Sequence, residues 1–269
     1  MSENEKIKPG RFRGISGSTL KIIAIIIMFI DHLAAVVIIE LPAYFYQQNN
    51  MEKYQATIKL YYLMRIIGRI AFPIFIFLML EGIKYTKNKY KYLLRMFVFA
   101  VISEIPFTLA IKGSIKGISA TNVFFTLTIG LAVCILLDKL LQQKNRLWLF
   151  AALPIIVIGG FLAELLNTDY SYFGVLAIIA GCLVEKFVRH LGISIWKISN
   201  EKLCQTCTIV AICVVLSMQS KLETYCAFSL IPICLYNGKR GIRMKYFFYA
   251  FYPVHLLLLV AVKYLITGV

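Results

Sequence analysis

An acid and an imidazole stand side by side in the first long apolar run of the chain, within IMFIDHLAAVV. Ionisable side chains are costly inside a bilayer, and those found there usually mark a functional site. Asp31 and His32 point about 100° apart on a helix, so both can border one cavity. A histidine beside a carboxylate is a candidate general base, because imidazole titrates near neutral pH. The alternative is a structural pair that hydrogen-bonds to neighbouring helices.

Two arginines lie on one face of the next apolar segment, LMRIIGRIAFPIF. Arg65 and Arg69 are four residues apart, which places them on the same side of a helix. Their guanidinium groups would repel each other unless an anion lies between them, and Asp31, Glu104 or an anionic ligand group would serve. Snorkelling to lipid headgroups is the alternative, and it explains Arg65 better than the deeper Arg69.

Three further polar residues follow along the chain. Glu104 lies in VFAVISEIPFTL, and a buried glutamate needs a basic partner or a proton. We expect Arg65 or Arg69 to be that partner. Asn122, in SATNVFFTL, either orients a substrate or caps a helix, and Asp169, in NTDYSYFGV, either faces outward or caps the next helix.

The last apolar segment, YFFYAFYPVHLLLL, places Tyr249, Tyr252 and His255 at intervals of three, with Pro253 among them. Tyrosines alone would indicate a belt at the membrane interface. A buried histidine beside a proline favours a functional role instead. Because the charged groups lie at matching depth on four segments, we expect them to line one polar cavity.

The composition and the apolar runs predict the helices that position these residues. Of 269 residues, 60% are hydrophobic and 16% charged, with mean hydropathy +0.77, whereas a soluble domain carries about 25% charged residues. The apolar runs predict an all-α, polytopic transmembrane bundle of about nine helices, with a basic segment 1–18 followed by one domain, 19–269. The seventh and eighth spans are short and are open to an alternative, a hairpin that does not fully cross. The predicted spans are 19–41, 62–83, 92–111, 121–138, 147–165, 172–190, 205–219, 223–237 and 246–266.

The basic residues indicate the orientation. Twenty-one of the 29 Lys and Arg residues fall in the amino-terminal segment and in alternate loops, which predicts a cytoplasmic amino terminus and an extracytoplasmic carboxyl terminus in a multi-pass plasma-membrane protein. The net charge of +16 therefore does not call for a nucleic-acid partner. The Cys204–Cys207 CxxC motif has no second CxxC and no nearby histidine, so we expect no metal site.

Several of these segments together resemble the TraX family, membrane proteins associated with amino-terminal acetylation of conjugative pilin. The resemblance rests on LKIIAIIIMFIDH, RIIGRIAFPIFIFLMLEG, YLLRMFVFAVISEIPF, TNVFFTL, DYSYFGVL and FYPVHL. It implies a membrane acyltransferase that uses acyl-CoA from the cytoplasm. By the resemblance, His32 is the base, Asp31 orients it, and basic cytoplasmic loops receive the CoA phosphates. Residues that shape the site or bind substrate and cofactor are then Arg65, Arg69, Glu104, Asn122, Asp169, Tyr252 and His255.

The predicted function is transfer of an acetyl or other short acyl group from acyl-CoA to an amine or hydroxyl. The acceptor would be a peptide, a pilin-like protein or a glycan, acetyl-CoA would be the cosubstrate, and no metal would take part. A proton-coupled transporter would also place Asp, His, Glu and Arg at depth, and is the main alternative. A structural or assembly protein whose polar groups only pack helices is the third.

Overall fold

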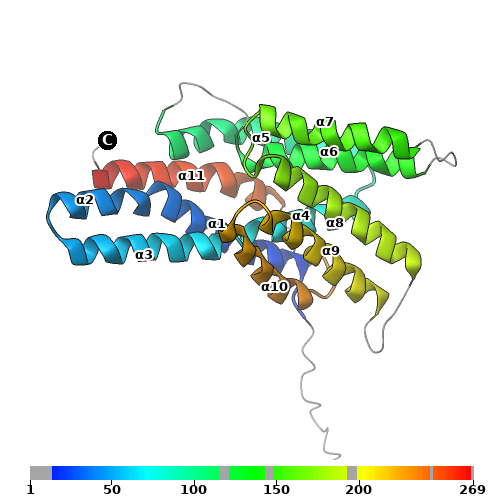
Figure 1. Ribbon diagram of the computed structural model, residues 1–269, viewed down its shortest axis with the longest axis horizontal. Coiled ribbons are helices and arrows are strands. Elements are labelled where there is room, and N and C mark those ends of the chain that lie inside the picture. The colour runs from blue at the N-terminus through cyan, green and yellow to red at the C-terminus, as the bar shows by residue number, and fades with distance from the viewer. Residues whose placement is uncertain (1–13, 115–120, 143–147, 193–198, 243–244, 268–269) are drawn as a thin grey trace, which may run out of the picture.

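The structure is a computed structural model that describes residues 14–114, 121–142, 148–192, 199–242 and 245–267, and it is helical (Figure 1). Within these ranges, the extended backbone is limited to one isolated parallel bridge, between Ile15 and Tyr236. The elements in order are α1 (Gly17–Val36), η1 (Ile38–Glu40), α2 (Leu41–Gln47), α3 (Met51–Gly68), α4 (Ala71–Tyr85), α5 (Lys89–Lys112), α6 (Val123–Leu141), α7 (Trp148–Leu165), α8 (Ser171–Leu191), α9 (Asn200–Ser217), η2 (Lys221–Ser229), α10 (Leu230–Cys234) and α11 (Lys245–Thr267).

Local sequence signals set many of the helix ends. The Ser and Asn residues that precede α1, α3, α5, α6 and α9 each accept a hydrogen bond from a backbone N–H of the first turn, which satisfies one of the donors left free at a helix start. At the other end, Gly113 and Gly192 stop α5 and α8 in the left-handed conformation that glycine adopts without steric cost.

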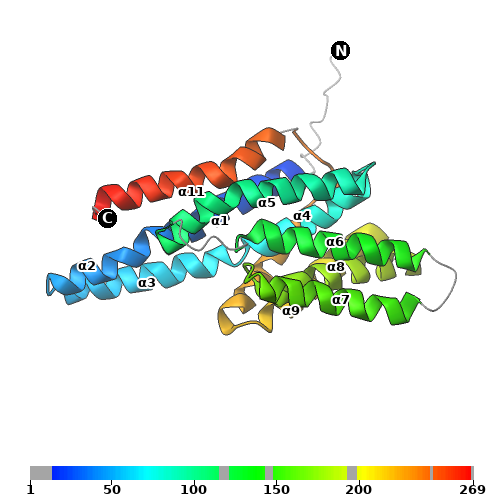
Figure 2. The same cartoon turned by 90° about the horizontal axis from the view of Figure 1, so that it is seen from above.

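The long helices run roughly along one axis. Figures 1 and 2 show α2, α3 and the carboxyl-terminal end of α11 together at one end of the molecule, while α6, α7, α8 and α9 extend to the other. The two groups overlap at the middle, where α1, α4 and α5 join them. This overlap brings residues from distant parts of the sequence to the same position along the long axis of the bundle.

Helix α4 lies at the centre of the packing. Nine of its 15 residues are buried, and it contacts α1, α8, α9 and η2. Small residues allow close approach nearby: a Cβ on Gly174 of α8 would lie 2.6 Å from Cγ2 of Thr126 in α6. Because lipid offers no hydrophobic drive between helices, such tight van der Waals contact is what holds them together.

Seven helical stretches of the described chain are long and apolar enough to cross a membrane, and α7 is a shorter apolar helix. The protein is therefore an all-α membrane protein, as predicted. Over the predicted eighth span, 223–237, the structure has no spanning helix: η2 and α10 form a short two-part return that packs against α9. For this segment the structure favours the alternative, a hairpin that does not fully cross. The polar sequence KLETYC at its start explains the difference, since a spanning helix needs about 20 mostly apolar residues.

The region assigned to a loop between the first two spans is also helical. Helices α2 and α3 form a hairpin over residues 41–68, and α3 carries Glu52, Lys53 and Lys59 on a largely polar sequence. The predicted second span, 62–83, is broken at Arg69 and Ile70, between the end of α3 at Gly68 and the start of α4 at Ala71. Pro73 accounts for the break, because it has no N–H to donate to the carbonyl of Arg69.

The connections assigned to the basic side meet at one end of the bundle. The backbone N–H groups of Gly17 and Ser18 donate to the carbonyls of Lys239 (2.8 Å) and Arg240 (3.0 Å). Lys186 pairs with Asp138 at 2.5 Å, and Lys89 pairs with the same carboxylate. The grouping agrees with the pattern of basic loops, while the direction in which the bundle crosses the membrane stays a prediction.

Candidate functional site

Both arginines of the second segment bind the carboxylate of Asp31. Arg65 donates from a terminal nitrogen to Oδ2 at 2.8 Å, and Arg69 donates from its own to Oδ1 at 2.8 Å. The Nε–H of Arg69 also donates to the backbone carbonyl of Arg65 at 3.2 Å. An anion does lie between the guanidinium groups, and it is Asp31 rather than lipid headgroups or Glu104.

A fourth member of this charged cluster was missed in the sequence. Glu223, in η2, accepts a hydrogen bond from Arg69 at 2.7 Å and is 5% exposed. By hydropathy it falls at the start of a predicted spanning helix, 223–237. The signal was nonetheless present, because Glu223 is an acid at the start of an otherwise apolar segment. Its second oxygen, Oε2, is buried and has no hydrogen-bond partner among the described residues.

His32 and His255 are in direct contact across α1 and α11. Nδ1 of His32 lies 2.7 Å from Nε2 of His255, and the two rings are nearly parallel, at 10° with centroids 5.0 Å apart. Nδ1 of His255 lies 2.8 Å from the backbone carbonyl of Phe251, one turn earlier in α11. The structure thus brings together two of the residues predicted for the site from opposite ends of the chain.

The expected contact in which Asp31 orients His32 is absent from the described structure. Both carboxylate oxygens of Asp31 are directed to the arginines, and His255 supplies the partner of His32. The reason is the 100° offset between adjacent helical positions: Asp31 faces α3, while His32 faces α11.

The prediction that Glu104 pairs with Arg65 or Arg69 is wrong. Its carboxylate accepts hydrogen bonds from the hydroxyls of Thr108 (3.1 Å) and Thr121 (2.8 Å), and from the side-chain amide of Asn122 at 2.6 Å. The backbone amides of Thr121 and Asn122 donate to it as well, each at 3.1 Å. Five donors satisfy a buried carboxylate without a cation. The sequence showed the acid but not the turn that folds back onto it.

Asn122 caps a helix, as one of its two interpretations predicted. Its side-chain oxygen accepts from the N–H of Phe124 at 2.9 Å, and its amide donates to the carbonyl of Ala100 at 2.8 Å. The side chain is fully buried. Asn122 therefore joins α5 to the start of α6, and every polar atom of its side chain is engaged within the protein.

Asp169 lies in the loop between α7 and α8, and it does not cap α8. The first residue of that helix is preceded by Tyr170, which makes no side-chain cap. The backbone N–H of Asp169 donates to the carbonyl of Thr121 at 2.8 Å, and its carbonyl accepts from the Thr126 hydroxyl. Burial raises the pKa of the Asp169 carboxyl to about 6, against the lowering effect of the nearby Arg69. Asp169 thus connects the arginine cluster with the Glu104 turn.

A cavity of about 350 Å³ lies between α1, α4, α5, α6, α11 and the 236–242 segment. Its lining runs along α1 from Gly17 to Met28, and from Thr86, which caps α4, back along α4 to Phe75. Eleven residues of helix rise about 17 Å, so both walls indicate that the cavity is about 17 Å deep. The apolar lining consists chiefly of Ile25, Met28, Phe75, Leu78, Met79, Met96, Leu127 and Phe248.

Three cationic side chains line the end of this cavity near the basic loops. Lys21, Arg95 and Arg240 come from α1, α5 and the 236–242 segment. In the part of the chain that the structure describes, none of the three forms a salt bridge, and Nε of Arg95 is buried without a hydrogen-bond partner. Lys21 lies over the ring of Phe248 and Arg95 over that of Tyr92. Cations at a cavity that have no acidic partner within a membrane protein favour an anionic ligand.

The opposite end of the cavity lies next to the histidine pair. Met28, in the lining, is one helical turn before His32 on α1. Tyr252, also in the lining, has its ring edge-on to His32 and His255, with centroids 5.8 and 5.6 Å away. Its hydroxyl is buried and, among the described residues, has no partner in hydrogen-bonding geometry.

The single polar cavity that the sequence predicted is therefore divided. Tyr252 lines the cavity; His32 and His255 lie against its ring but are not among the lining residues, and neither are Asp31, Arg65, Arg69 and Glu104. These four side chains are taken up by contacts within the protein, in the Asp31 cluster and the Glu104 turn. The remaining candidates for direct chemistry are His32, His255 and Tyr252.

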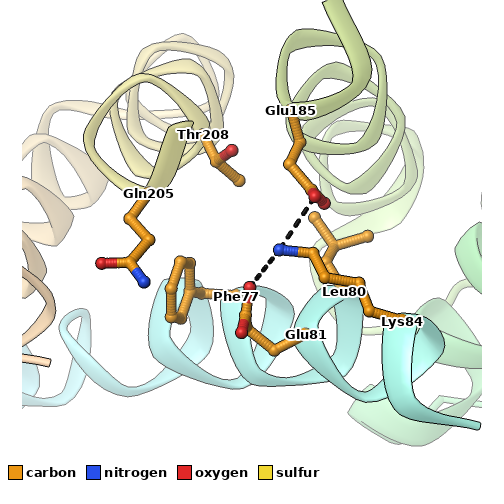
Figure 3. A pocket seen from close by; sticks show the side chains of 7 residues that line it. All are labelled: Phe77, Leu80, Glu81, Lys84, Glu185, Gln205 and Thr208. Atoms are coloured by element: carbon orange, nitrogen blue, oxygen red, sulfur yellow. Dashed lines mark hydrogen bonds and ion pairs between the residues drawn. The ribbon is translucent and has the colours of Figure 1, made fainter. Parts of the chain in front are cut away.

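A separate ion-pair cluster ties α4 to α8 and α9 (Figure 3). The Lys84 ammonium lies between Glu81 and Glu185 and is 2.8 Å from the latter. Gln205 and Thr208 of α9 face the same space, and Glu81 Oε2, Gln205 Oε1 and Thr208 Oγ1 are buried without partners among the described residues. The pairing of Glu81 with a nearby lysine agrees with its position at the end of α4, and the cluster serves to join three helices.

Similarity to known proteins extends over nearly the whole chain. It is 23% identical to "Probable fimbrial assembly protein FimC, serogroup H1" of Dichelobacter nodosus, over 92% of this chain and 96% of that protein. No solved structure matches it. The family model described as TraX protein matches residues 16–263, which contain all the elements of the site. The chain belongs to the TraX family.

Proposed function

We propose that this membrane protein transfers an acetyl or other short acyl group from acyl-CoA to an amine or hydroxyl acceptor. The observation that carries the proposal is the cavity, which has at one end three cations without a salt bridge to any described residue, and beside the other end the His32–His255 pair. The membership in TraX and the similarity to a fimbrial assembly protein support a pilus-related role, with a pilin-like amino terminus as one acceptor.

The shape and lining of the cavity suit acyl-CoA. Its phosphates would meet Lys21, Arg95 and Arg240, and its long, mostly uncharged pantetheine arm would follow the apolar walls. The thioester would then come to Tyr252, close to His32. Guanidinium groups bind phosphate with paired hydrogen bonds, which suits Arg95, whose buried Nε is unengaged.

His32 would act as general base. It removes a proton from the acceptor as the acceptor nitrogen or oxygen attacks the thioester carbonyl carbon. The carbon–sulfur bond breaks when the tetrahedral intermediate collapses, and the CoA thiolate leaves and takes up the proton. The Tyr252 hydroxyl, which is buried and without a hydrogen-bond partner among the described residues, would donate to the developing oxyanion. The arginines would support the site through Asp31 and Glu223 rather than contact the oxyanion themselves.

Purified protein in lipid nanodiscs, given labelled acetyl-CoA and an amine-bearing peptide or a hydroxyl-bearing glycan, tests the proposal. We expect label in the acceptor for wild type and none for His32→Ala. His190→Ala is the matched control, because His190 is exposed near the end of α8. It should keep full activity.

Two results would overturn the acyltransferase. Proton-dependent uptake of a solute by vesicles, without acyl transfer, would indicate the transporter. Absence of both activities in wild type, with normal folding and assembly of the His32→Ala, Asp31→Asn variant, would indicate a structural role.

A further inference from the structure

The proton positions of the histidine pair follow from its partners. The carbonyl of Phe251 can only accept, so the Nδ1 of His255 that lies 2.8 Å from it must carry a hydrogen. A neutral imidazole carries one hydrogen, which leaves Nε2 of His255 as an acceptor. The nitrogen 2.7 Å away, Nδ1 of His32, must then be the donor. Nε2 of His32 is left with a free lone pair.

From this chain of hydrogen bonds we infer that His255 is the positioning residue of the acyl-transfer base, an inference that rests on the proposed function. His255 fixes His32 in the tautomer whose Nε2 can accept a proton. It also fixes the plane of the ring, because the imidazoles are parallel within 10°. A buried residue next to a base commonly sets its tautomer in this way.

Two further observations support the role. His255 is 4% exposed and held by rings on several sides, with the Phe251 ring at 4.8 Å and 14° and the Phe29 ring at 6.2 Å. Its own orientation is therefore set before substrate arrives. Asp31, the expected orienting residue, has both oxygens engaged by Arg65 and Arg69. No carboxylate competes with His255 for Nδ1 of His32 among the described residues.

Two conservative variants separate positioning from packing. In His255→Gln the side-chain oxygen stands where Nε2 stood and can accept from His32. In His255→Asn the amide is one bond shorter and reaches only the Phe251 end. Both keep a polar side chain of similar size. We expect kcat for acetyl transfer to fall about 10²-fold or more in His255→Ala and His255→Asn, with KM for acetyl-CoA within twofold of wild type. In His255→Gln, kcat should be at least tenfold higher than in His255→Asn.

A spectroscopic measurement keeps this inference separate from the proposed function. Nitrogen-15 shifts of the imidazoles, recorded on labelled protein in lipid bilayers, distinguish protonated from bare ring nitrogens. We expect His32 to be protonated at Nδ1 and bare at Nε2 in wild type and in His255→Gln. In His255→Asn and His255→Ala, a share of His32 should convert to the other tautomer. The chain has only three histidines, and His190→Gln simplifies the assignment.

A bare Nδ1 on His32 in wild type would overturn the inference, and so would an unchanged tautomer in both His255→Asn and His255→Ala. Loss of activity in His255→Gln as large as in His255→Asn would do the same. If wild type transfers no acyl group but the nitrogen shifts are as expected, the proposed function fails while the pairing of the two histidines stands.

Discussion

The carboxylate of Asp31 lies directly on Gly68. A Cβ added to Gly68 would be 2.0 Å from Oδ1 of Asp31 and 2.4 Å from its Cγ. The missing side chain therefore makes room for the acid that joins Arg65 and Arg69, at the place where α3 ends. Asp31 of the IDH segment and Gly68 and Arg69 of the GRIAFPIF segment thus form one structural unit.

Gly68→Ala should destabilise the protein by displacing this carboxylate. We expect a loss of about 1–3 kcal/mol of unfolding free energy, because the new Cβ would overlap a carboxylate that two arginines hold in place. Thermal denaturation in nanodiscs measures it. Gly160→Ala is the control, since its new Cβ meets only Tyr172, at 3.5 Å. Equal stability of the two variants would show that Asp31 moves aside without cost.

Asp31→Asn should act mainly on stability. Removing the charge leaves Arg65 without its carboxylate and Arg69 with Glu223 alone. Breaking a fully buried ion pair costs about 3–5 kcal/mol, and this is the upper value here because the side chains of Asp31 and Arg65 are 14% and 23% exposed. Glu201→Gln, which alters the exposed pair with Arg189, should cost about 1 kcal/mol or less. Denaturation midpoints compare the two. A fully stable Asp31→Asn protein with altered kcat would contradict this role and restore Asp31 to the chemistry.

Stability should also depend on pH through Asp169. Its carboxyl has an ordinary pKa of 3.8 but a pKa raised to about 6 by burial in the folded protein. Between these values the folded state binds more protons than the unfolded state, so the free energy of unfolding falls as pH rises through this range. The folded state should therefore lose up to about 3 kcal/mol from this residue between pH 4 and pH 7.

Asp169→Asn removes this dependence because it cannot ionise. Measured from pH 4 to pH 7, wild type should lose stability relative to Asp169→Asn. Parallel curves for the two proteins would show that the Asp169 carboxyl titrates as it does in water.

Arg95→Gln should weaken acyl-CoA binding without harming the fold. Its guanidinium lines the cavity and makes no salt bridge with any residue the structure describes. A charged hydrogen bond to phosphate is worth about 1.5–3 kcal/mol, so KM for acetyl-CoA should rise about 10- to 100-fold with kcat nearly unchanged. Lys139→Gln, an exposed change on α6 outside the cavity, is the control. Equal KM values in the two variants would place the phosphates elsewhere.

Much of the fold followed from local sequence. Long apolar runs predict spanning helices, and α1, α5, α6, α8 and α11 fall close to the expected ranges. The predicted helix boundaries are wrong where polar and apolar residues alternate in one segment. In η2 and α10, a polar start and a short length prevent a full crossing, and in α3 the helix continues through polar residues that hydropathy assigns to a loop.

The sequence alone determined that this chain is a membrane protein and that acids, arginines and histidines are retained at depth, because charge inside a bilayer is too costly to occur by chance. Only the tertiary structure decided which of them meet. Adjacent residues on a helix face different neighbours, so Asp31 binds arginines while His32 binds His255 from the last helix. Likewise, Glu104 satisfies its charge through a turn 17 residues later in the chain, a contact created by the fold and not by spacing.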